Sequence, residues 1–287
     1  MRSILVLVAL LSFQLVYAQK GSKLIKLEDI YKSNTFSMKS VLGFNAMKDG
    51  LRFTKLETKD KNQSINVYNL ATGSWVKVLF SNKDKKIDGN KLNISSYTFS
   101  EDETKILLFT EPQPVYRHSV FYKVYVYDTK SQDLISVDDN KVMHASFSPD
   151  GSKVAYMQDN NMFYKNLETG ERIAITTDGK WNHIINGNCD WVYEEEFSFT
   201  QAYQWSPDGK YLAYYRFDES KVPEYTMHIY NGLYPENYKY KYPKAGEANS
   251  VVEIRVYNLA TKAVVTVNTG NETDQYIPRI KWAKKNN

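Results

Sequence analysis

The sequence predicts an all-β fold in which four-stranded sheets recur along the chain, as the blades of a β-propeller do. Two observations lead to this prediction: one kind of turn recurs between aromatic strands, and alternating strand segments recur after these turns. The composition agrees, because 14% of the residues are aromatic, a share that favours β-structure. We expect a partial β-propeller of about four blades and the start of a fifth, with a short helical insertion that carries an acidic motif.

The recurring turn is clearest where Ser-Pro-Asp-Gly occupies residues 148–151 and again residues 206–209. In such a turn proline fixes its own φ, and glycine accepts a positive φ without strain. Looser copies follow the same plan of aromatic strand, turn and second apolar strand. Aligned on the serine or its equivalent, the copies lie 54, 48, 58 and 77 residues apart and begin at Ala46, Ser100, Ser148, Ser206 and Ala283.

The second recurring element is an alternating strand that enters a hairpin and is followed by another strand. Its copies lie at 65–73, 124–130, 162–170 and 254–261. Four meandering strands make one propeller blade, which takes about 40–50 residues. The last two intervals are longer than that, so we expect inserted structure within residues 181–200 and 222–249. Repeat scaffolds carry function on such insertions.

The termini predict how the rest of the chain is organised. Residues 1–18 have the layout of a cleaved signal peptide: Arg2, an apolar run from Ile4 to Val16, and a small residue, Ala18. We therefore expect export to a periplasmic or extracellular location and no membrane contact after cleavage; an uncleaved anchor is the alternative. Residues 19–43 are an N-terminal segment, and residues 44–287 are expected to form an incomplete propeller.

Composition excludes several function classes. The net charge of +4, from 37 basic and 33 acidic residues, is too small to indicate nucleic acid or a membrane surface. The single cysteine, Cys189, cannot form an internal disulfide, and we expect a small buried side chain. The four histidines lack zinc-site spacing, and neither a Gly-x-Ser-x-Gly elbow nor a glycine-rich phosphate loop occurs. We expect no metal, no cofactor and no catalytic residue in this chain.

The first insertion contains three consecutive carboxylates, Glu194 to Glu196, between two aromatic pairs, Trp191/Tyr193 and Phe197/Phe199. Neighbouring carboxylates raise each other's pKa, so the cluster is costly unless a cation neutralises it. Asp190 is a good N-cap for a short helix, which would place the glutamates in its first two turns. Adjacent helical residues point about 100° apart, so two carboxylates can converge on one ammonium group. A solvated acidic turn is the alternative.

The acidic stretch resembles the double-glutamate signature of the dipeptidyl peptidase IV family, in the prolyl oligopeptidase superfamily of serine peptidases. Further matches keep the family's order along the chain, and the resemblance covers roughly Leu27 to the end. These matches are Arg117-His118-Ser119, Trp205 to Gly209, Arg216 to Glu219, Val222-Pro223 and Tyr242 to Gly246. One departure is Ser250, which stands where family members commonly have proline.

The resemblance implies an eight-bladed propeller followed by an α/β-hydrolase domain, and that domain, with its catalytic triad, would be absent from this chain. It also implies that Glu195 and Glu196 grip the free α-amino group of a peptide substrate. Arg117 would help to hold these glutamates and the carbonyl of the substrate's second residue. N-terminal Xaa-Pro or Xaa-Ala dipeptides would then be released. Glu194 would form structural hydrogen bonds or face solvent. Residues 225–242 would form propeller packing or a subunit contact, and because family members often dimerise through this region, a homodimer is expected.

Two other functions stay open at this point. One is a free-standing propeller that binds peptides or amines without any hydrolase domain. The other is a tripeptidyl relative with a different glutamate arrangement, although three glutamates together with Arg117 favour dipeptide release. A coding sequence that continues into a Gly-x-Ser-x-Gly elbow and a later histidine would separate the first alternative from a peptidase.

Overall fold

In the computed structural model, the described residues are 24–38, 43–83, 85–87 and 89–283. The predicted signal peptide, residues 1–18, lies outside them. The chain divides into two compact units between Gly43 and Phe44. In the first unit, helix α2 (Leu27–Tyr31) begins where the Lys26 amide donates a 3.1 Å hydrogen bond to Asp29 Oδ2. Within the described ranges, no helix is both long enough and apolar enough to cross a membrane.

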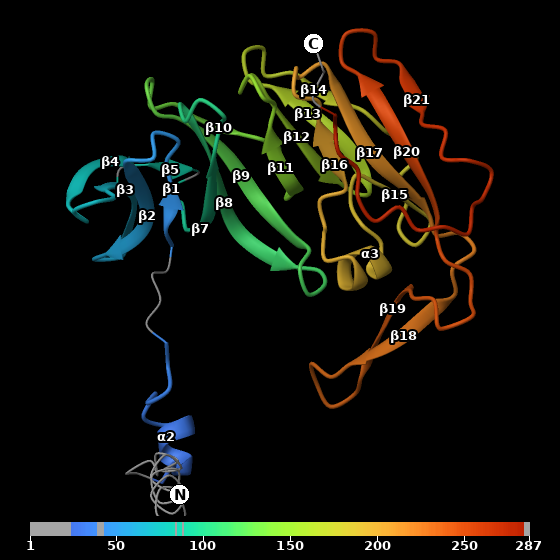
Figure 1. Cartoon of the computed structure of the whole chain (residues 1–287), viewed down its shortest axis with the longest axis horizontal. Helices are drawn as coiled ribbons and strands as arrows, with labels where there is room; N and C mark the ends of the chain where they lie inside the picture. Colours follow the sequence, from blue (N-terminus) through green and yellow to red (C-terminus); the bar gives the residue numbers. More distant parts are fainter. Residues whose placement is uncertain (1–23, 39–42, 84, 88, 284–287) are drawn as a thin grey trace, which may run out of the picture. The chain divides into compact units, whose positions relative to one another are not determined.

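The second unit contains four successive antiparallel sheets (Figure 1). The first is β1 (Asn45–Ala46), β2 (Arg52–Lys59), β3 (Asn62–Asn69) and β4 (Trp75–Ser81). The second is β7 (Ile94–Phe99), β8 (Lys105–Pro114), β9 (Val120–Asp128) and β10 (Leu134–Ser136). The third is β11 (Met143–Phe147), β12 (Lys153–Gln158), β13 (Asn161–Asn166) and β14 (Arg172–Ala174). Each is a meander of four strands in sequence order, so the all-β, blade-like prediction is confirmed.

The fourth sheet has five strands and is interrupted by both insertions. It comprises β15 (Ile184–Asn186), β16 (Tyr203–Trp205), β17 (Tyr211–Asp218), β20 (Val251–Asn258) and β21 (Val264–Thr266). Both β15 and β16 pair with β17, at opposite ends of that long strand. Helix α3 (Trp191–Glu196) lies between β15 and β16, and the hairpin of β18 (Glu224–Ile229) and β19 (Glu236–Lys241) lies between β17 and β20. A small hairpin of β5 (Lys86–Ile87) and β6 (Asn90–Lys91) follows the first sheet.

The predicted turns form as the sequence indicates. The Ser148 amide donates to the Lys153 carbonyl oxygen at 2.9 Å, and the Gly151 amide donates to the Ser148 carbonyl oxygen at 2.8 Å. Gly151 has a φ of 65°, the left-handed value that glycine tolerates best. The second copy repeats this geometry, with Gly209 at a φ of 69°. Each turn therefore closes a hairpin between two strands of one blade.

Alternate residues of the central strands pack against opposite neighbouring sheets. On β8, Ile106 and Leu108 join the cluster shared with the first sheet, whereas Leu107 joins the cluster shared with the third. On β12, Tyr156 faces the second sheet and Ala155 faces the fourth. Successive side chains of a strand point to opposite faces, so a strand that is apolar throughout is buried on both sides. The sheets are thus stacked through continuous apolar layers.

The last cluster differs because a helix and an irregular segment cover the fourth sheet. Val252 and Ile254 of β20 pack in it with Tyr193 of α3, and Ile277 and Ile280 lie against it. Between β21 and Ala283 the described chain contains no strand, so the start of a fifth blade at Trp282 stays a prediction. Trp282 Nε1 donates to the Gln204 carbonyl oxygen at 3.3 Å, which places this segment along β16.

Candidate functional site

Helix α3 begins at the N-cap that the sequence predicts. Asp190 Oδ1 accepts a 2.9 Å hydrogen bond from the Tyr193 amide, and Asp190 Oδ2 accepts a 2.6 Å hydrogen bond from Ser250 Oγ. Asp190 is buried, and burial raises its pKa, while the bonds from Ser250 and the backbone amides oppose that rise. Ser250 is the departure from the family pattern, and its hydroxyl supplies a donor that proline lacks.

Tyr193 anchors the helix to the sheet beneath it. Its ring is 1% exposed and lies 4.9 Å, centroid to centroid, from the ring of Phe217 on β17. Its hydroxyl accepts a 2.7 Å hydrogen bond from the Ile277 amide. The Arg279 guanidinium, 4.7 Å from the Phe199 ring, donates to the Phe197 carbonyl oxygen just beyond the helix. Both ends of this six-residue helix are therefore fixed by segments distant in sequence.

Glu194 ties the helix to the loop between β8 and β9. Its Oε1 accepts hydrogen bonds from the amides of His118 at 2.7 Å and Ser119 at 2.9 Å, and its Oε2 accepts one from Ser119 Oγ at 2.5 Å. Both Glu194 and Ser119 are 1% exposed or less. A buried carboxylate with three donors is satisfied and fixed. Of the two alternatives for Glu194, the structural hydrogen bonds are confirmed.

Glu195 and Arg117 form the ion pair that the family resemblance implies. Arg117 Nε lies 3.3 Å from Glu195 Oε1 and 3.2 Å from Oε2. The arginine side chain is 71% exposed, whereas the glutamate side chain is 18% exposed. Within the described residues, the two terminal nitrogens of Arg117 have no hydrogen-bond partner. They are therefore available to donate to a ligand.

Glu196 is exposed at the last position of α3, and no hydrogen bond or ion pair to it occurs within the described part of the chain. The structure thus brings Arg117 and Glu195 together and leaves Glu196 beside them in sequence without a protein partner. Three adjacent carboxylates have three different environments: one saturated, one paired at a single nitrogen, and one open to solvent. The alternative that the acidic stretch is a solvated turn is therefore excluded for Glu194 and stays open for Glu195 and Glu196.

Other sequence predictions near the site can be compared with the structure. Cys189 is 1% exposed, and its burial raises the pKa of its thiol, so the prediction of a small buried side chain is confirmed. His144 is half-buried; desolvation of its imidazole lowers its pKa, and its Nε2 lies 2.7 Å from Asn188 Oδ1. Among the residues described, no cluster of three His, Cys, Asp or Glu side chains has the geometry to hold a metal ion.

Sequence reasoning missed Ser250, Ile277 and Arg279 as supports of the acidic helix. Each lies at least 50 residues from the acidic stretch, so no pattern within that stretch could have identified it. The substitution of serine for proline at residue 250 was a visible signal. Only the structure shows that the Ser250 hydroxyl lies within hydrogen-bond distance of Asp190 and therefore supports the helix.

Comparison with known proteins places this geometry in a family. Residues 100–287 match the family model described as the dipeptidyl peptidase IV (DPP IV) N-terminal region. The chain is 37% identical over 230 residues to dipeptidyl aminopeptidase B of Saccharomyces cerevisiae, covering 78% of this chain and 26% of that protein. It is 33% identical over 232 residues to dipeptidyl-aminopeptidase B of Aspergillus niger, covering 74% of this chain and 26% of the relative.

A solved structure agrees with these matches. The crystal structure of Porphyromonas gingivalis dipeptidyl peptidase 4 superposes with a TM-score of 0.80 at 41% identity, covering 90% of this chain and 37% of that one. The chain therefore spans between about a quarter and two fifths of the length of these relatives. Its sheets are blades of the same partial propeller, and the chain belongs to the dipeptidyl peptidase IV family, of which it forms the N-terminal region.

Proposed function

We propose that Glu195 and Glu196 bind the free α-ammonium group of a peptide, and that this chain is the recognition part of an exopeptidase that releases N-terminal dipeptides. The observation that carries the proposal is the unequal use of the three glutamates on α3. Glu194 is saturated by bonds from the His118–Ser119 loop. Glu195 and Glu196 remain available at the end of a helix that is fixed on both sides.

The charges of these residues complement an ammonium group. Glu195 and Glu196 carry two negative charges and Arg117 carries one positive charge, so the three side chains have a net charge of about −1. An ammonium group offers three donors in a compact volume, and charge-assisted hydrogen bonds are stronger than neutral ones. The terminal nitrogens of Arg117 can donate to a peptide carbonyl near the ammonium. Holding the peptide by its first residue sets which bond reaches a nucleophile.

In this proposal the catalytic serine, aspartate and histidine belong to an α/β-hydrolase domain outside these 287 residues, which contain no Gly-x-Ser-x-Gly elbow. A coding sequence that continues past Asn287 into that elbow and a later histidine supports the proposal. A coding sequence that ends without them would instead make the chain a peptide-binding propeller without peptidase activity.

Two further parts of the proposal concern location and assembly. The signal-peptide pattern of residues 1–18 supports an exported protein, periplasmic or extracellular. The tip of the β18–β19 hairpin supports a homodimer, because Tyr230, Leu233 and Tyr234 are 72%, 97% and 85% exposed. Sedimentation of the full chain tests the second point: a monomer at all concentrations contradicts it.

Binding of the tripeptide Ala-Pro-Ala to the full chain, measured by isothermal titration calorimetry, tests the ammonium site. We expect acetylation of the peptide N-terminus to abolish binding. Glu195→Gln and Glu196→Gln should each cost about 2 kcal/mol or more, which is about a 30-fold weaker dissociation constant. Binding should also weaken above the reference pKa of an α-amino group, about 7.7–8.0, because the amine loses its charge.

Glu236→Gln, at an exposed position of the hairpin, is the matched control and should bind like the wild type. Equal affinity for the acetylated peptide, or wild-type affinity in both glutamate variants, would show that the site lies elsewhere.

A further inference from the structure

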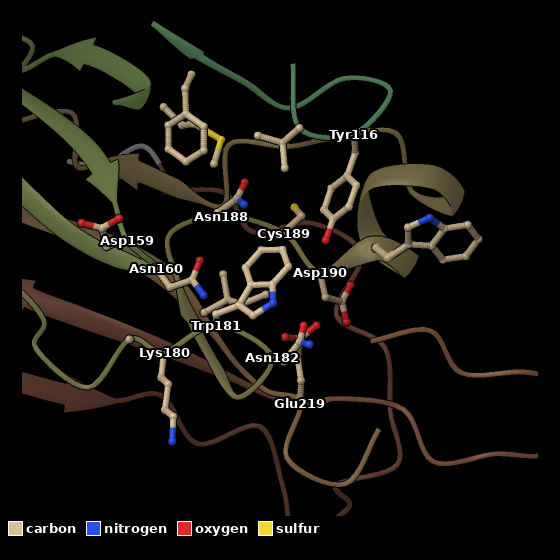
Figure 2. Close-up of a pocket in the computed structure, with 16 residues that line it drawn as sticks. Tyr116, Asp159, Asn160, Lys180, Trp181, Asn182, Asn188, Cys189, Asp190 and Glu219 are labelled. Atoms are coloured by element: carbon tan, nitrogen blue, oxygen red, sulfur yellow. The ribbon is translucent and has the colours of Figure 1, made fainter. Parts of the chain in front are cut away.

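A cavity of about 330 Å³ lies beside the N-terminal end of α3 (Figure 2). Its lining comes from the β8–β9 loop, the β12–β13 turn, residues 179–191 and Glu219. Neither Glu195, Glu196 nor Arg117 lines it, so it is separate from the ammonium site proposed above. One ordered water occupies roughly 30 Å³, and the cavity therefore has room for a small molecule.

Glu219 is a buried carboxyl group in this cavity with no hydrogen-bond partner at its side chain among the described residues. The residue is 6% exposed, and its backbone is fixed: its amide donates to the His183 carbonyl oxygen at 2.8 Å, and its carbonyl oxygen accepts from the Val222 amide at 2.9 Å. In Figure 2 its side chain extends from the ribbon into the cavity, and its carboxyl group overlaps the Asn182 side chain in this view. Among the described residues, the unpartnered side-chain atoms that are fully enclosed are Asn186 Oδ1, Trp205 Nε1 and the Tyr215 hydroxyl, so the Glu219 oxygens still reach the interior of the cavity, where a ligand can contact them.

The groups around Glu219 leave its charge uncompensated. Burial raises the pKa of Glu219 to about 8. The negative charges of Asp190 and Asp218 raise this pKa further, whereas the positive charge of Lys241 lowers it. Lys241 Nζ donates to the Val222 carbonyl oxygen at 2.7 Å and forms no ion pair with Glu219. Asp190 has both oxygens occupied by its N-cap and Ser250 bonds. A cation delivered from outside is the group that would compensate Glu219.

The rest of the lining indicates what kind of cation fits. Trp181 lines the cavity together with Asp190 and Glu219 and is 51% exposed, so it lies where the lining meets solvent (Figure 2). Aromatic faces attract ammonium groups, and the attraction strengthens where water is excluded. Part of the remaining wall is apolar, including Val115, Phe121 and Ile185. A metal ion is disfavoured, because no three-ligand cluster exists among the described side chains.

We propose that this cavity binds a primary ammonium group on a short apolar stem, with Glu219 as its ionic partner and Trp181 covering it at the mouth. The stem contacts the apolar wall. Binding requires the ionised carboxylate, so the Glu219 carboxyl releases its proton to solvent as the ammonium enters. Because Asp190 both lines the cavity and caps α3, an occupied cavity also supports the helix that carries Glu195 and Glu196.

Calorimetric titration of the full chain with n-butylammonium chloride at pH 8.5 tests the proposal, with n-butanol as the neutral probe. A five-heavy-atom ligand is expected to bind with a dissociation constant on the order of 1 mM. Butanol should bind at least about tenfold more weakly, because it cannot pair with the carboxylate. Absence of butylammonium binding up to about 50 mM, or equal binding of butanol, overturns the proposal.

Variants separate this cavity from the site at the end of α3. Glu219→Gln should weaken butylammonium binding about tenfold or more, and Trp181→Leu, at a position outside the core, should weaken it severalfold. Glu196→Gln should leave the component of binding that depends on Glu219 unchanged. Loss of binding in Glu196→Gln with retention in Glu219→Gln assigns the probe to the α3 site and overturns this proposal without affecting the proposed function.

The pH dependence gives an independent readout. The affinity for butylammonium should rise by about tenfold per pH unit from pH 6 toward pH 8 and level off above it, because Glu219 must ionise. Asp190, Asp218, Lys241 and Tyr116 interact electrostatically with Glu219, and Asp159 and Lys180 also line the cavity, so these groups enter the pH profile through their effect on the Glu219 carboxyl. The Glu219→Gln variant should show no such rise; a flat wild-type profile contradicts the role of Glu219.

Discussion

The two insertions of the fourth sheet differ in how they are held. The α3 segment, residues 181–200, is bonded to remote parts of the second unit: Glu194 to Ser119, Asp190 to Ser250, and Tyr193 to Ile277. The β18–β19 hairpin, by contrast, pairs mainly with itself. Its base packs through aromatic rings, with Trp191 and Tyr242 4.4 Å apart, whereas Leu233 at its tip is 97% exposed.

The fold fixes the position of α3 by long-range contacts, whereas the tip of the hairpin remains exposed at the surface. A side chain that holds a ligand at a fixed position needs rigid neighbours. Helix α3 has such neighbours, because Asp190, Tyr193 and Glu194 are each hydrogen-bonded to a residue distant in sequence. A hairpin tip that offers apolar area to another molecule needs no such supports, and its exposed side chains make few internal contacts. Substitutions in the two segments should therefore have unequal effects on stability.

The largest effect is expected at Glu194. Replacing it by alanine leaves the amide and hydroxyl of Ser119 buried without an acceptor, and the part-buried His118 amide loses its acceptor as well. We expect a loss of about 3–5 kcal/mol in the free energy of unfolding, measured by urea denaturation. Glu196→Ala is the matched control on the same helix and should change it by less than about 0.5 kcal/mol. Equal effects of the two substitutions on the free energy of unfolding would contradict the structural role of Glu194.

A somewhat smaller effect should appear at Glu219, at the root of the hairpin, and it should depend on pH. Its pKa is about 8 in the folded protein against 4.5 ordinarily, so the folded state binds more protons between these values. The stability of the wild type should therefore fall as pH rises from about 4.5 to 8, relative to Glu219→Gln. The difference is on the order of 4 kcal/mol, read from denaturation curves at pH 5 and pH 8.5. Parallel pH profiles would contradict the buried, ionisable state.

Asp190→Ala should destabilise the protein by about 2 kcal/mol, because the N-cap of α3 and the bond from Ser250 are both lost. A double-mutant cycle with Ser250→Ala measures their coupling, expected at about 1 kcal/mol. Additive effects of the two substitutions would mean that the serine hydroxyl does not support the cap.

The smallest effect is expected at the hairpin tip. Leu233→Ser and Tyr234→Ser should each change the free energy of unfolding by less than about 0.5 kcal/mol at low protein concentration, since both side chains are exposed. A loss of more than 2 kcal/mol in such a dilute denaturation experiment would show that the tip is packed, and the contrast with α3 would fail.

Much of the fold was readable from particular residues. The Ser-Pro-Asp-Gly turns at 148–151 and 206–209 predicted their hairpins, because proline and glycine restrict the backbone locally. Asp190 predicted the start of α3 for the same reason: its cap bond spans three residues. The repeat spacing predicted where insertions interrupt the blades, and the order of motifs predicted the family.

Local geometry and the succession of strands thus follow from the amino-acid sequence, since these depend on interactions between near neighbours. Only the tertiary structure decided between structural hydrogen bonds and solvent for Glu194, because that depends on the His118–Ser119 loop arriving from 75 residues away. It also decided that Ser250 supports Asp190, and that Glu219 is buried beside a cavity without a partner. Burial and long-range hydrogen bonds are properties of the packed chain, and three consecutive identical residues differ there only by what the fold places against each.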